Sequence, residues 1–438
     1  MKLNTHALRY LTSEDWRVLA GVEQGSKNHE VVPTPLIQQL AGLRGGSGVH
    51  KCISNLAKVG LIAKVKNARY DGYRLAYGGL DYLALNAHRR SNTVFSLGNQ
   101  IGVGKESDIY ITAAPDSTLQ VLKIHRLGRI SFRSVKSNRD YLRNRSTGSW
   151  LYLSRLAAHK EFEVMKVLKR EGFAVPQPIS WNRHTIVMEF IDAFPLRMIE
   201  SIPEPGKLYA ELMDTIVQLA ARGLIHGDFN EFNILIKELP QPDGSIELSA
   251  VLIDFPQAVS TNHANAEMYF DRDVACVKRY FERRFKYVSD EPGPFFADAV
   301  KDIGAGRRLD VEVEASGFSK KMARDLERYV EVADNRDGAE GDEKGEDGAE
   351  EDNNEQVDEE DDEGEEADDA ETDALAGEGQ GDEGVGSDRL NALSIHDSAE
   401  TKGRTAASYG LLPLEMPTGH DEVAEKVHKQ KAAAGWAI

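Results

Sequence analysis

The sequence predicts an α+β protein in which an N-terminal winged helix precedes a larger two-lobed unit and an acidic tail. Over residues 1–92, apolar residues recur at helical spacing and are followed by one hairpin pattern. Over residues 93–333, strand patterns come first and helical patterns dominate later, which is the order of a two-lobed α+β enzyme. Residues 334–388 are mostly Glu, Asp and Gly, and residues 389–438 form a mixed C-terminal tail.

The acidic tail dominates the charge of the chain. The 438 residues carry a net charge of -19, yet residues 334–388 alone hold 27 acidic and 2 basic side chains. The rest of the chain is therefore mildly basic, with a net charge of +6. Because the acidic segment has too few apolar residues to offset its ordering entropy, we expect it to be disordered.

Several classes of protein are disfavoured by composition. The first 30 residues lack the pattern of a secretory signal, and no run of 18 apolar residues suggests a membrane span. The only two cysteines, Cys52 and Cys276, lie far apart, which excludes a disulfide framework and a zinc finger. We expect an intracellular protein with two buried thiols.

The first unit has the pattern of three helices and a wing. Thr12-Ser13-Glu14-Asp15 predicts a capped helix start, and Pro33-Thr34-Pro35 introduces a second helix. Residues 45–48 are predicted as a turn before a third helix from Val49, and residues 61–77 as a hairpin around Asp71-Gly72. The third helix and the hairpin carry the candidate nucleic-acid contacts Lys51, Lys58, Lys64, Lys66, Arg69 and Arg74. A protein-docking domain with a solvated basic face remains the alternative.

The strongest chemical signal is the segment HGDFNEFN, residues 226–233, followed by IDF at 253–255. Phosphoryl transfer needs a carboxylate beside the attacking oxygen and oxygen ligands for Mg²⁺. Asp228 and Asn233 are five residues apart, which is the separation of the base and the metal-binding amide in the protein-kinase loop HRDxxxxN. Asp254 occupies the position of the aspartate in the kinase DFG motif.

Upstream residues complete a candidate nucleotide site. Gly102, Gly104, Lys105 and Ser107 lie between two strand patterns and could cradle phosphates, although the spacing excludes a Walker loop. Lys123 on the next strand would point at the α- and β-phosphates, with Glu161 as its expected acidic partner and Glu163 as a weaker candidate.

The set GVGKESDIY, VLKIH, HGDFNEFN and IDFPQ resembles the Rio family of atypical serine/threonine protein kinases, and the preceding winged helix is similar to that of its second subfamily. Relative to ordinary kinases, Gly227 replaces the arginine of HRD, and Pro256 replaces the glycine of DFG. Because no APE motif follows, a groove for extended peptide substrates is in doubt, and a signalling kinase is disfavoured.

The resemblance implies a role for each candidate site residue. Asp228 would be the catalytic base, Asn233 and Asp254 would hold Mg²⁺, and Lys123 would grip ATP phosphates beneath the glycine loop. The segment with Met188, Glu189 and Ile191 would hold adenine through backbone groups. The resemblance also implicates Asp254 as an acceptor of the γ-phosphoryl group, so that the enzyme would act as an ATPase switch.

The resemblance further implies a role in late maturation of the small (40S) ribosomal subunit and processing of its pre-rRNA. The implied partners are the pre-40S particle, assembly factors and a nuclear export receptor, with a cytoplasmic location and shuttling through the nucleus. Residues 125–145, with seven Lys and Arg from Arg126 to Arg145, suit an RNA-contacting loop or a solvated one that carries phosphorylatable serines. A catalytically silent RNA-binding scaffold is the alternative to the enzyme. The apolar stretches LNALSI and YGLLPLEM could dock a partner, although a weakly ordered tail is favoured.

Overall fold

A computed structural model describes residues 3–65, 71–127, 150–242, 246–301, 308–318, 322–324, 326 and 411–414. All of these belong to one compact unit, formed by residues 1–336 together with 405–438. The predicted acidic segment 334–388, the stretch LNALSI and the basic residues between 128 and 145 lie outside the described residues. None of the helices in the described ranges is long and apolar enough to cross a membrane.

The N-terminal part is the predicted winged helix. It contains α1 (Ser13–Gly25), α2 (Thr34–Ala41), α3 (Gly46–Lys58) and the two-stranded wing β1 (Ile62–Val65) and β2 (Gly72–Leu75), after the short 3₁₀ helix η1 (His6–Arg9). The Thr12 side chain accepts a hydrogen bond from the Asp15 amide, and the Asp15 carboxylate accepts one from the Thr12 amide, so the predicted capping box is present. A fourth helix, α4 (Tyr77–Arg90), follows the wing and was not predicted.

Two local predictions in this region are wrong. Residues 46–48 form the first turn of α3, and the chain turns into it at Gly45, whose φ of 101° is left-handed. The wing pairs Val65 with Gly72, so Gly72 lies in a strand, and Asp71-Gly72 is not the centre of the turn.

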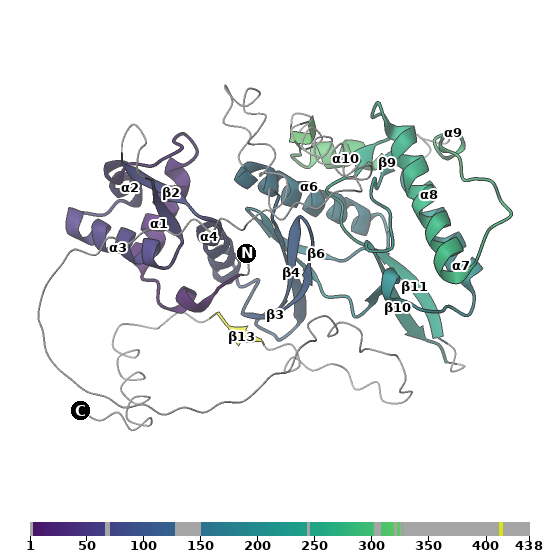
Figure 1. Cartoon of the computed structure of the whole chain (residues 1–438), viewed down its shortest axis with the longest axis horizontal. Coiled ribbons are helices and arrows are strands. Elements are labelled where there is room, and N and C mark those ends of the chain that lie inside the picture. The colour runs from purple at the N-terminus through teal and green to yellow at the C-terminus, as the bar shows by residue number, and fades with distance from the viewer. Residues whose placement is uncertain are drawn as a thin grey trace, which may run out of the picture. The chain divides into compact units, whose positions relative to one another are not determined.

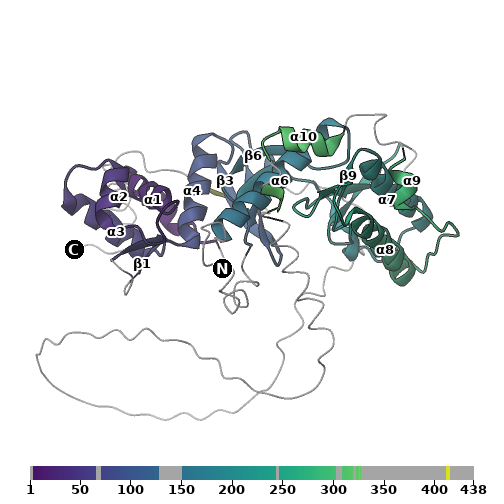
Figure 2. The same ribbon diagram turned by 90° about the horizontal axis from the view of Figure 1, so that it is seen from above.

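The next part is a six-stranded sheet, the first lobe of the larger unit (Figure 1). The strand order is β13-β3-β4-β5-β7-β6, and every neighbouring pair is antiparallel. Helix α6 (Trp150–Arg170) packs against β5, β6 and β7, and both views place it along this sheet (Figure 2). The strands are β3 (Ser96–Val103), β4 (Ser107–Ala113), β5 (Leu119–His125), β6 (Pro178–Asn182), β7 (Thr185–Glu189) and β13 (Leu412–Pro413).

The second lobe is built on helices α7 (Pro205–Ala221) and α8 (Ala266–Phe285), which pack together. Pro242-Asp243-Gly244 predicts a hairpin, and it is present as β10 (Ile234–Pro240) paired with β11 (Ile246–Leu252), although residues 243–245 of its turn lie outside the described residues. The sequence pattern also predicts a helix over residues 319–333, of which only residues 322–324 and 326 are described. The smaller elements are β8 (Phe194–Pro195), η4 (Leu196–Met198), β9 (Leu224–Ile225), β12 (Val259–Ser260), α9 (Phe296–Ala299) and α10 (Leu309–Ala315).

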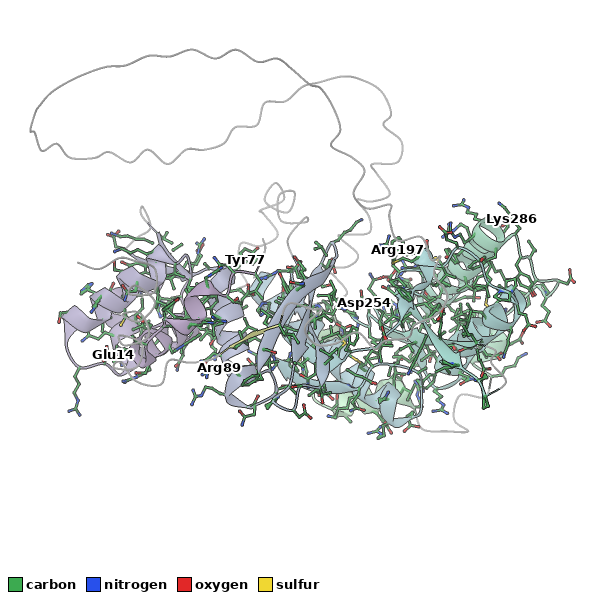
Figure 3. All side chains as sticks on the ribbon, turned by 90° about the horizontal axis from the view of Figure 1, so that it is seen from below. Glu14, Tyr77, Arg89, Arg197, Asp254 and Lys286 are labelled. Atoms are coloured by element: carbon green, nitrogen blue, oxygen red, sulfur yellow. The ribbon has the colours of Figure 1, made fainter. Side chains whose placement is uncertain are left out.

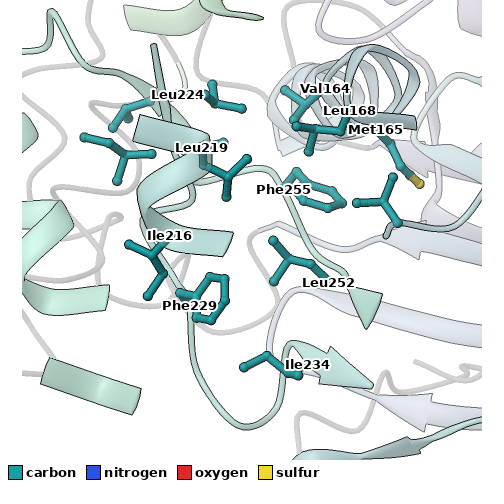
Figure 4. Packing of buried hydrophobic residues seen from close by; sticks show 14 of the residues in the cluster. Val164, Met165, Leu168, Ile216, Leu219, Leu224, Phe229, Ile234, Leu252 and Phe255 are labelled. Carbon is teal, nitrogen blue, oxygen red and sulfur yellow. The ribbon is translucent and has the colours of Figure 1, made fainter. Parts of the chain in front are cut away.

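Two apolar clusters hold these parts together. The larger one joins α6 to the second lobe, and Figure 4 shows Val164 and Leu168 facing Leu219 and Phe255 within it. The other cluster combines winged-helix residues such as Leu56 and Leu85 with first-lobe residues such as Leu122. Because one core serves both, the winged helix is packed onto the first lobe by side chains of the two domains.

Candidate active site

The centre of the site is a buried ion cluster around Lys123 on β5. Its Nζ lies 2.7 Å from Oε1 of Glu161 on α6 and 2.8 Å from Oδ1 of Asp254, which follows β11. The Lys123 and Glu161 side chains are about 5 % and 1 % exposed, whereas Asp254 is 36 % exposed. The predicted pair of Lys123 with Glu161 is therefore present, and Glu163 instead contacts Lys166.

Burial and charge act in opposite directions on this cluster. Burial alone would lower the pKa of Lys123, but the Asp254 and Glu161 carboxylates together hold that pKa above its usual value. Burial would raise the pKa of Glu161, but Lys123 and the neighbouring His125 ring lower it from 4.5 to about 2. Lys123 is therefore a fixed cation and Glu161 a fixed anion throughout the physiological range.

The segment 226–233 is the loop between β9 and β10, and hydrogen bonds fold it tightly around Asp228. The Asn233 Nδ2 donates to Oδ2 of Asp228 at 2.9 Å and to its carbonyl oxygen at 3.0 Å. The Asn230 Nδ2 donates to the other carboxylate oxygen of Asp228 at 2.7 Å. The Ile253 amide donates to the Asn233 carbonyl oxygen, which joins this loop to the chain entering Asp254. Asn233 thus holds Asp228 by its side chain and is bonded through its backbone to the residue before Asp254.

Burial gives Asp228 the ionisation behaviour of a general base. It raises the pKa of Asp228 from 3.8 to about 6; the charge of His226 opposes this increase, and that of Asp254 adds to it. A carboxylate with a pKa near 6 is mostly ionised at neutral pH and is a stronger base than an exposed aspartate.

The backbone of the loop explains why glycine replaces the arginine of HRD. Gly227 has a left-handed φ of 78°, and a Cβ at this position would lie 2.8 Å from the carbonyl oxygen of Gln257. A side chain of any other residue would therefore be strained and would collide with backbone.

A buried aspartate on α8, which sequence reasoning missed, anchors this loop. Asp273 is about 1 % exposed and accepts hydrogen bonds from the amides of Gly227 at 2.8 Å and Phe229 at 3.0 Å. Arg272 donates to the Gly227 carbonyl from the same helix. The available sequence signal was an acid on the apolar face of a helical pattern, next to Phe270 and Val274.

Asp254 itself has an unusual backbone. Its φ of 73° is left-handed, which is uncommon for a residue with a side chain. Directly after it, Phe255 is buried and packs edge-on against the His226 ring, whose centroid is 5.3 Å away. These contacts fix the turn, so that the partly exposed carboxylate of Asp254 (labelled in Figure 3) meets the ammonium of Lys123.

The predicted glycine loop is the turn between β3 and β4. The Gly104 amide donates to the Ser107 carbonyl at 2.7 Å, and Gly102 lies opposite Ile109. Ile109 in turn pairs with Lys123 across β4 and β5, so the loop ends beside the strand that carries the lysine. Lys105 is exposed on this turn, where a bound phosphate could be reached.

The predicted adenine segment begins at the end of β7 and continues beyond it, where the chain passes from the first lobe toward the second. Met188 is buried in the larger cluster, and Glu189 pairs with Gln120 of β5. The Glu189 carboxylate accepts a hydrogen bond from the Gln177 amide and lies 3.5 Å from Lys169, so this side chain is part of the structure of the linker. Ile191 is half-buried and has no regular secondary structure.

The donor set near Asp228 fits a magnesium ion. Carboxylate and amide oxygens are the ligands that Mg²⁺ prefers. Both hydrogen bonds that the Asn233 side chain makes with other described residues use its Nδ2, which leaves Oδ1 to bind a cation. Within the described ranges, no group of three or more His, Cys, Asp or Glu side chains offers a competing metal site.

The basic residues of the winged helix are arranged only partly as predicted. Lys51, Lys58 and Lys64 are exposed on α3 and β1, whereas Lys66 and Arg69 lie outside the described residues. Arg74 is exposed but forms an ion pair with Glu30 at 2.7 Å. Such surface pairs are weak, so phosphate could displace this one.

One basic residue was misassigned. Arg126, which the sequence placed in an RNA-contacting loop, is about 3 % exposed. Its guanidinium donates two hydrogen bonds of 2.8 Å to Asp81 of α4 and one of 3.1 Å to Asp108 of β4. Arg126 therefore links the winged helix to the first lobe. Its charge can be buried because the two carboxylates compensate it.

Comparisons with known proteins identify this arrangement. The RIO domain family matches residues 108–292, and the family described as Rio2, N-terminal, matches residues 8–91. The chain is 56% identical over 329 residues to the serine/threonine-protein kinase rio2 of Schizosaccharomyces pombe, covering 75% of this chain and 92% of that protein. The chain belongs to the Rio2 family of serine/threonine-protein kinases.

Further Rio2 kinases agree with this assignment. RIO2 of Saccharomyces cerevisiae is 49% identical over 354 residues, which cover 76% of this chain and 82% of that protein. The crystal structure of the Rio2 kinase–ADP/Mg²⁺–phosphoaspartate complex from Chaetomium thermophilum matches with 62% identity and a TM-score of 0.71, covering 76% of this chain and all of that one. The family and the enzyme class predicted from the motifs are thus confirmed.

Proposed function

We propose that this Rio2-family kinase uses ATP and Mg²⁺ as an ATPase switch, with Asp254 as the first acceptor of the γ-phosphoryl group, during late maturation of the small ribosomal subunit. The observation that carries the chemical part is the position of Asp254. Its carboxylate is partly exposed, is held by a left-handed turn and lies 2.8 Å from the Lys123 ammonium. The related structure from C. thermophilum holds ADP, Mg²⁺ and a phosphoaspartate.

The residues divide the work as follows. Lys123 supplies a fixed positive charge to the phosphates, and Glu161 keeps its side chain in place. Asn233 and Asp254 would hold Mg²⁺, which neutralises phosphate charge when bound. Backbone groups of the Gly102–Ser107 turn would cover the phosphates.

The proposed transfer has two steps. In the first, a carboxylate oxygen of Asp254 attacks the γ-phosphorus, the bond to the β–γ bridging oxygen breaks, and ADP leaves with the bridging oxygen. In the second, water attacks the phosphoaspartate, Asp228 takes the proton from that water, and inorganic phosphate leaves while the Asp254 carboxylate is regenerated. A pKa of about 6 makes Asp228 suitable for this proton transfer.

The ribosomal part of the proposal is supported by the winged helix. Lys51, Lys58 and Lys64 are exposed on α3 and on the wing, as expected of a surface that follows phosphates. Association with pre-40S particles and pre-rRNA, with assembly factors and with an export receptor, and a cytoplasmic location with nuclear shuttling, form part of the proposal.

The test combines γ-labelled ATP with charge reversal. The protein is incubated with labelled ATP and Mg²⁺, with and without small ribosomal particles, and we expect protein-bound label that turns over to free phosphate. Lys51→Glu with Lys64→Glu should weaken binding to the particles, whereas Lys237→Glu, which changes an exposed lysine on β10, should not. Lasting transfer of label to another protein would instead indicate a kinase acting in trans, and unchanged particle binding would favour a protein-docking winged helix.

A further inference from the structure

A strand from the C-terminal tail completes the sheet of the first lobe. β13 pairs antiparallel with β3, with Leu412 opposite Leu97 and Pro413 opposite Ser96 (Figure 1). The Leu414 amide donates to the Phe95 carbonyl at 2.8 Å. Without β13, β3 would be the edge of the sheet, with backbone groups open to pairing.

Apolar side chains next to β13 enter the core. Leu414 is only 6 % exposed and belongs to the cluster that also contains Val94, Leu97 and Tyr110. Leu411 packs against the larger cluster. The segment therefore binds by backbone pairing and by side-chain burial, which together define recognition by strand addition.

Proline at position 413 suits a strand that ends a sheet. Because Leu414 donates toward β3, an amide at position 413 would point away from β3, since alternate residues of a strand donate in opposite directions. Proline has no amide hydrogen, so the outer side of β13 lacks a donor there for a further strand. The segment Leu-Leu-Pro-Leu can therefore pair with β3 on its inner side, while its outer side is poorly suited to pair with a further strand.

We propose that the β3 edge is a docking site for an extended apolar segment and that its occupant is residues 411–414 of the same chain, which act as a latch. Leu326 is buried in the larger cluster and Leu411 packs against it, and the acidic segment lies between these two residues in the sequence. Covalent connection gives the latch a high effective concentration at its site, which a strand of a separate molecule would have to exceed. Release of residues 411–414 would leave β3 as the edge of the sheet.

Hydrogen exchange on the full-length chain tests the latch. We expect the amide of residue 414 and the start of β3 to be protected in the wild type. Leu414→Asp should lower the protection of both by about tenfold or more, because a carboxylate cannot remain in the apolar cluster. Leu393→Asp, in the other apolar stretch of the tail, is the matched control and should leave this protection unchanged. A synthetic peptide of residues 408–417 should restore protection of β3 when added to the Leu414→Asp chain.

Each other outcome would overturn the proposal. An unprotected residue 414 in the wild type would mean that the latch is not docked, and protection retained in Leu414→Asp would mean that this side chain does not hold it. Failure of the peptide to protect β3 would contradict a docking edge. Protection that increases with protein concentration would assign the occupant to the tail of a second copy.

Discussion

The buried pair of Lys123 and Glu161 gives the sharpest test of the active-site electrostatics. The perturbations are Glu161→Gln, Lys123→Met and the two combined. Glu161→Gln keeps the shape of the side chain but leaves the buried ammonium with Asp254 as its one charged partner at hydrogen-bond distance among the described residues. Lys123→Met conversely leaves the Glu161 carboxylate buried without its cation.

The magnitude follows from the ionisation of Glu161. Its pKa falls from 4.5 to about 2, and each unit corresponds to a little over 1 kcal/mol, so the folded state gains about 3 kcal/mol from this carboxylate. Because the pKa is depressed by folding, this stabilisation is present above pH 4.5 and is lost as the pH falls toward 2. Each single change should therefore cost about 3 kcal/mol at pH 7. The double change should cost less than the sum, because the one acidic partner of Lys123 that then remains, Asp254, is partly exposed.

The assay is urea unfolding without nucleotide, in the presence of a metal chelator, at several pH values. The matched control is Lys207→Met, which breaks the exposed pair of Lys207 with Glu247 and should change the stability very little. Equal stability of Glu161→Gln and wild type, or single effects that simply add, would refute the reasoning. The reasoning would also be refuted if the difference in unfolding free energy between Glu161→Gln and wild type did not shrink below pH 4.5.

Three further changes probe the loop around Asp228. Asp228→Asn should abolish turnover yet stabilise the metal-free protein by about 1–2 kcal/mol at pH 7, because a buried charge is removed while one hydrogen bond is lost. In unfolding experiments this gain should shrink as the pH falls from about 6 toward 3.8, where the wild-type carboxyl is protonated; a gain independent of pH would contradict the raised pKa. Asp273→Asn should lower the free energy of unfolding by about 2 kcal/mol, because two loop amides lose a charged acceptor. It should also change kcat more than the KM for ATP. An unchanged kcat would show that the loop keeps its conformation without Asp273. Gly227→Ala should lower the melting temperature, and a neutral effect would mean that the loop can move away from Gln257.

Local patterns predicted the elements that the chain forms with its near neighbours. The capping residues of α1, the hairpins and the spacing of Asp228 and Asn233 depend on residues a few positions apart, so the sequence displays them directly. The pair of Lys123 with Glu161 was predictable because the order of motifs resembled a known family.

The features that sequence reasoning missed depend on contacts between distant segments. Asp273 reaches Gly227 from 46 residues away, and Arg126 is paired with Asp81 from 45 residues away. A basic residue such as Arg126, inside a basic stretch, is predicted to be exposed unless its carboxylate partners are known to be near. Burial of Leu414 likewise arises from a sheet edge that forms more than 300 residues earlier in the chain.

The central claim concerns the first covalent destination of the γ-phosphoryl group. An acyl phosphate reacts with hydroxylamine and is reduced by borohydride, so rapid quenching of the protein with labelled ATP, followed by reduction and mass spectrometry, locates it. We predict that the wild type yields a reduced side chain at Asp254, which reports the phosphoaspartate. More of this product should be found when Asp228 is replaced by Asn, and none in Asp254→Asn. Phosphate found only on serine or threonine, or an acyl phosphate that persists in Asp254→Asn, would contradict the account.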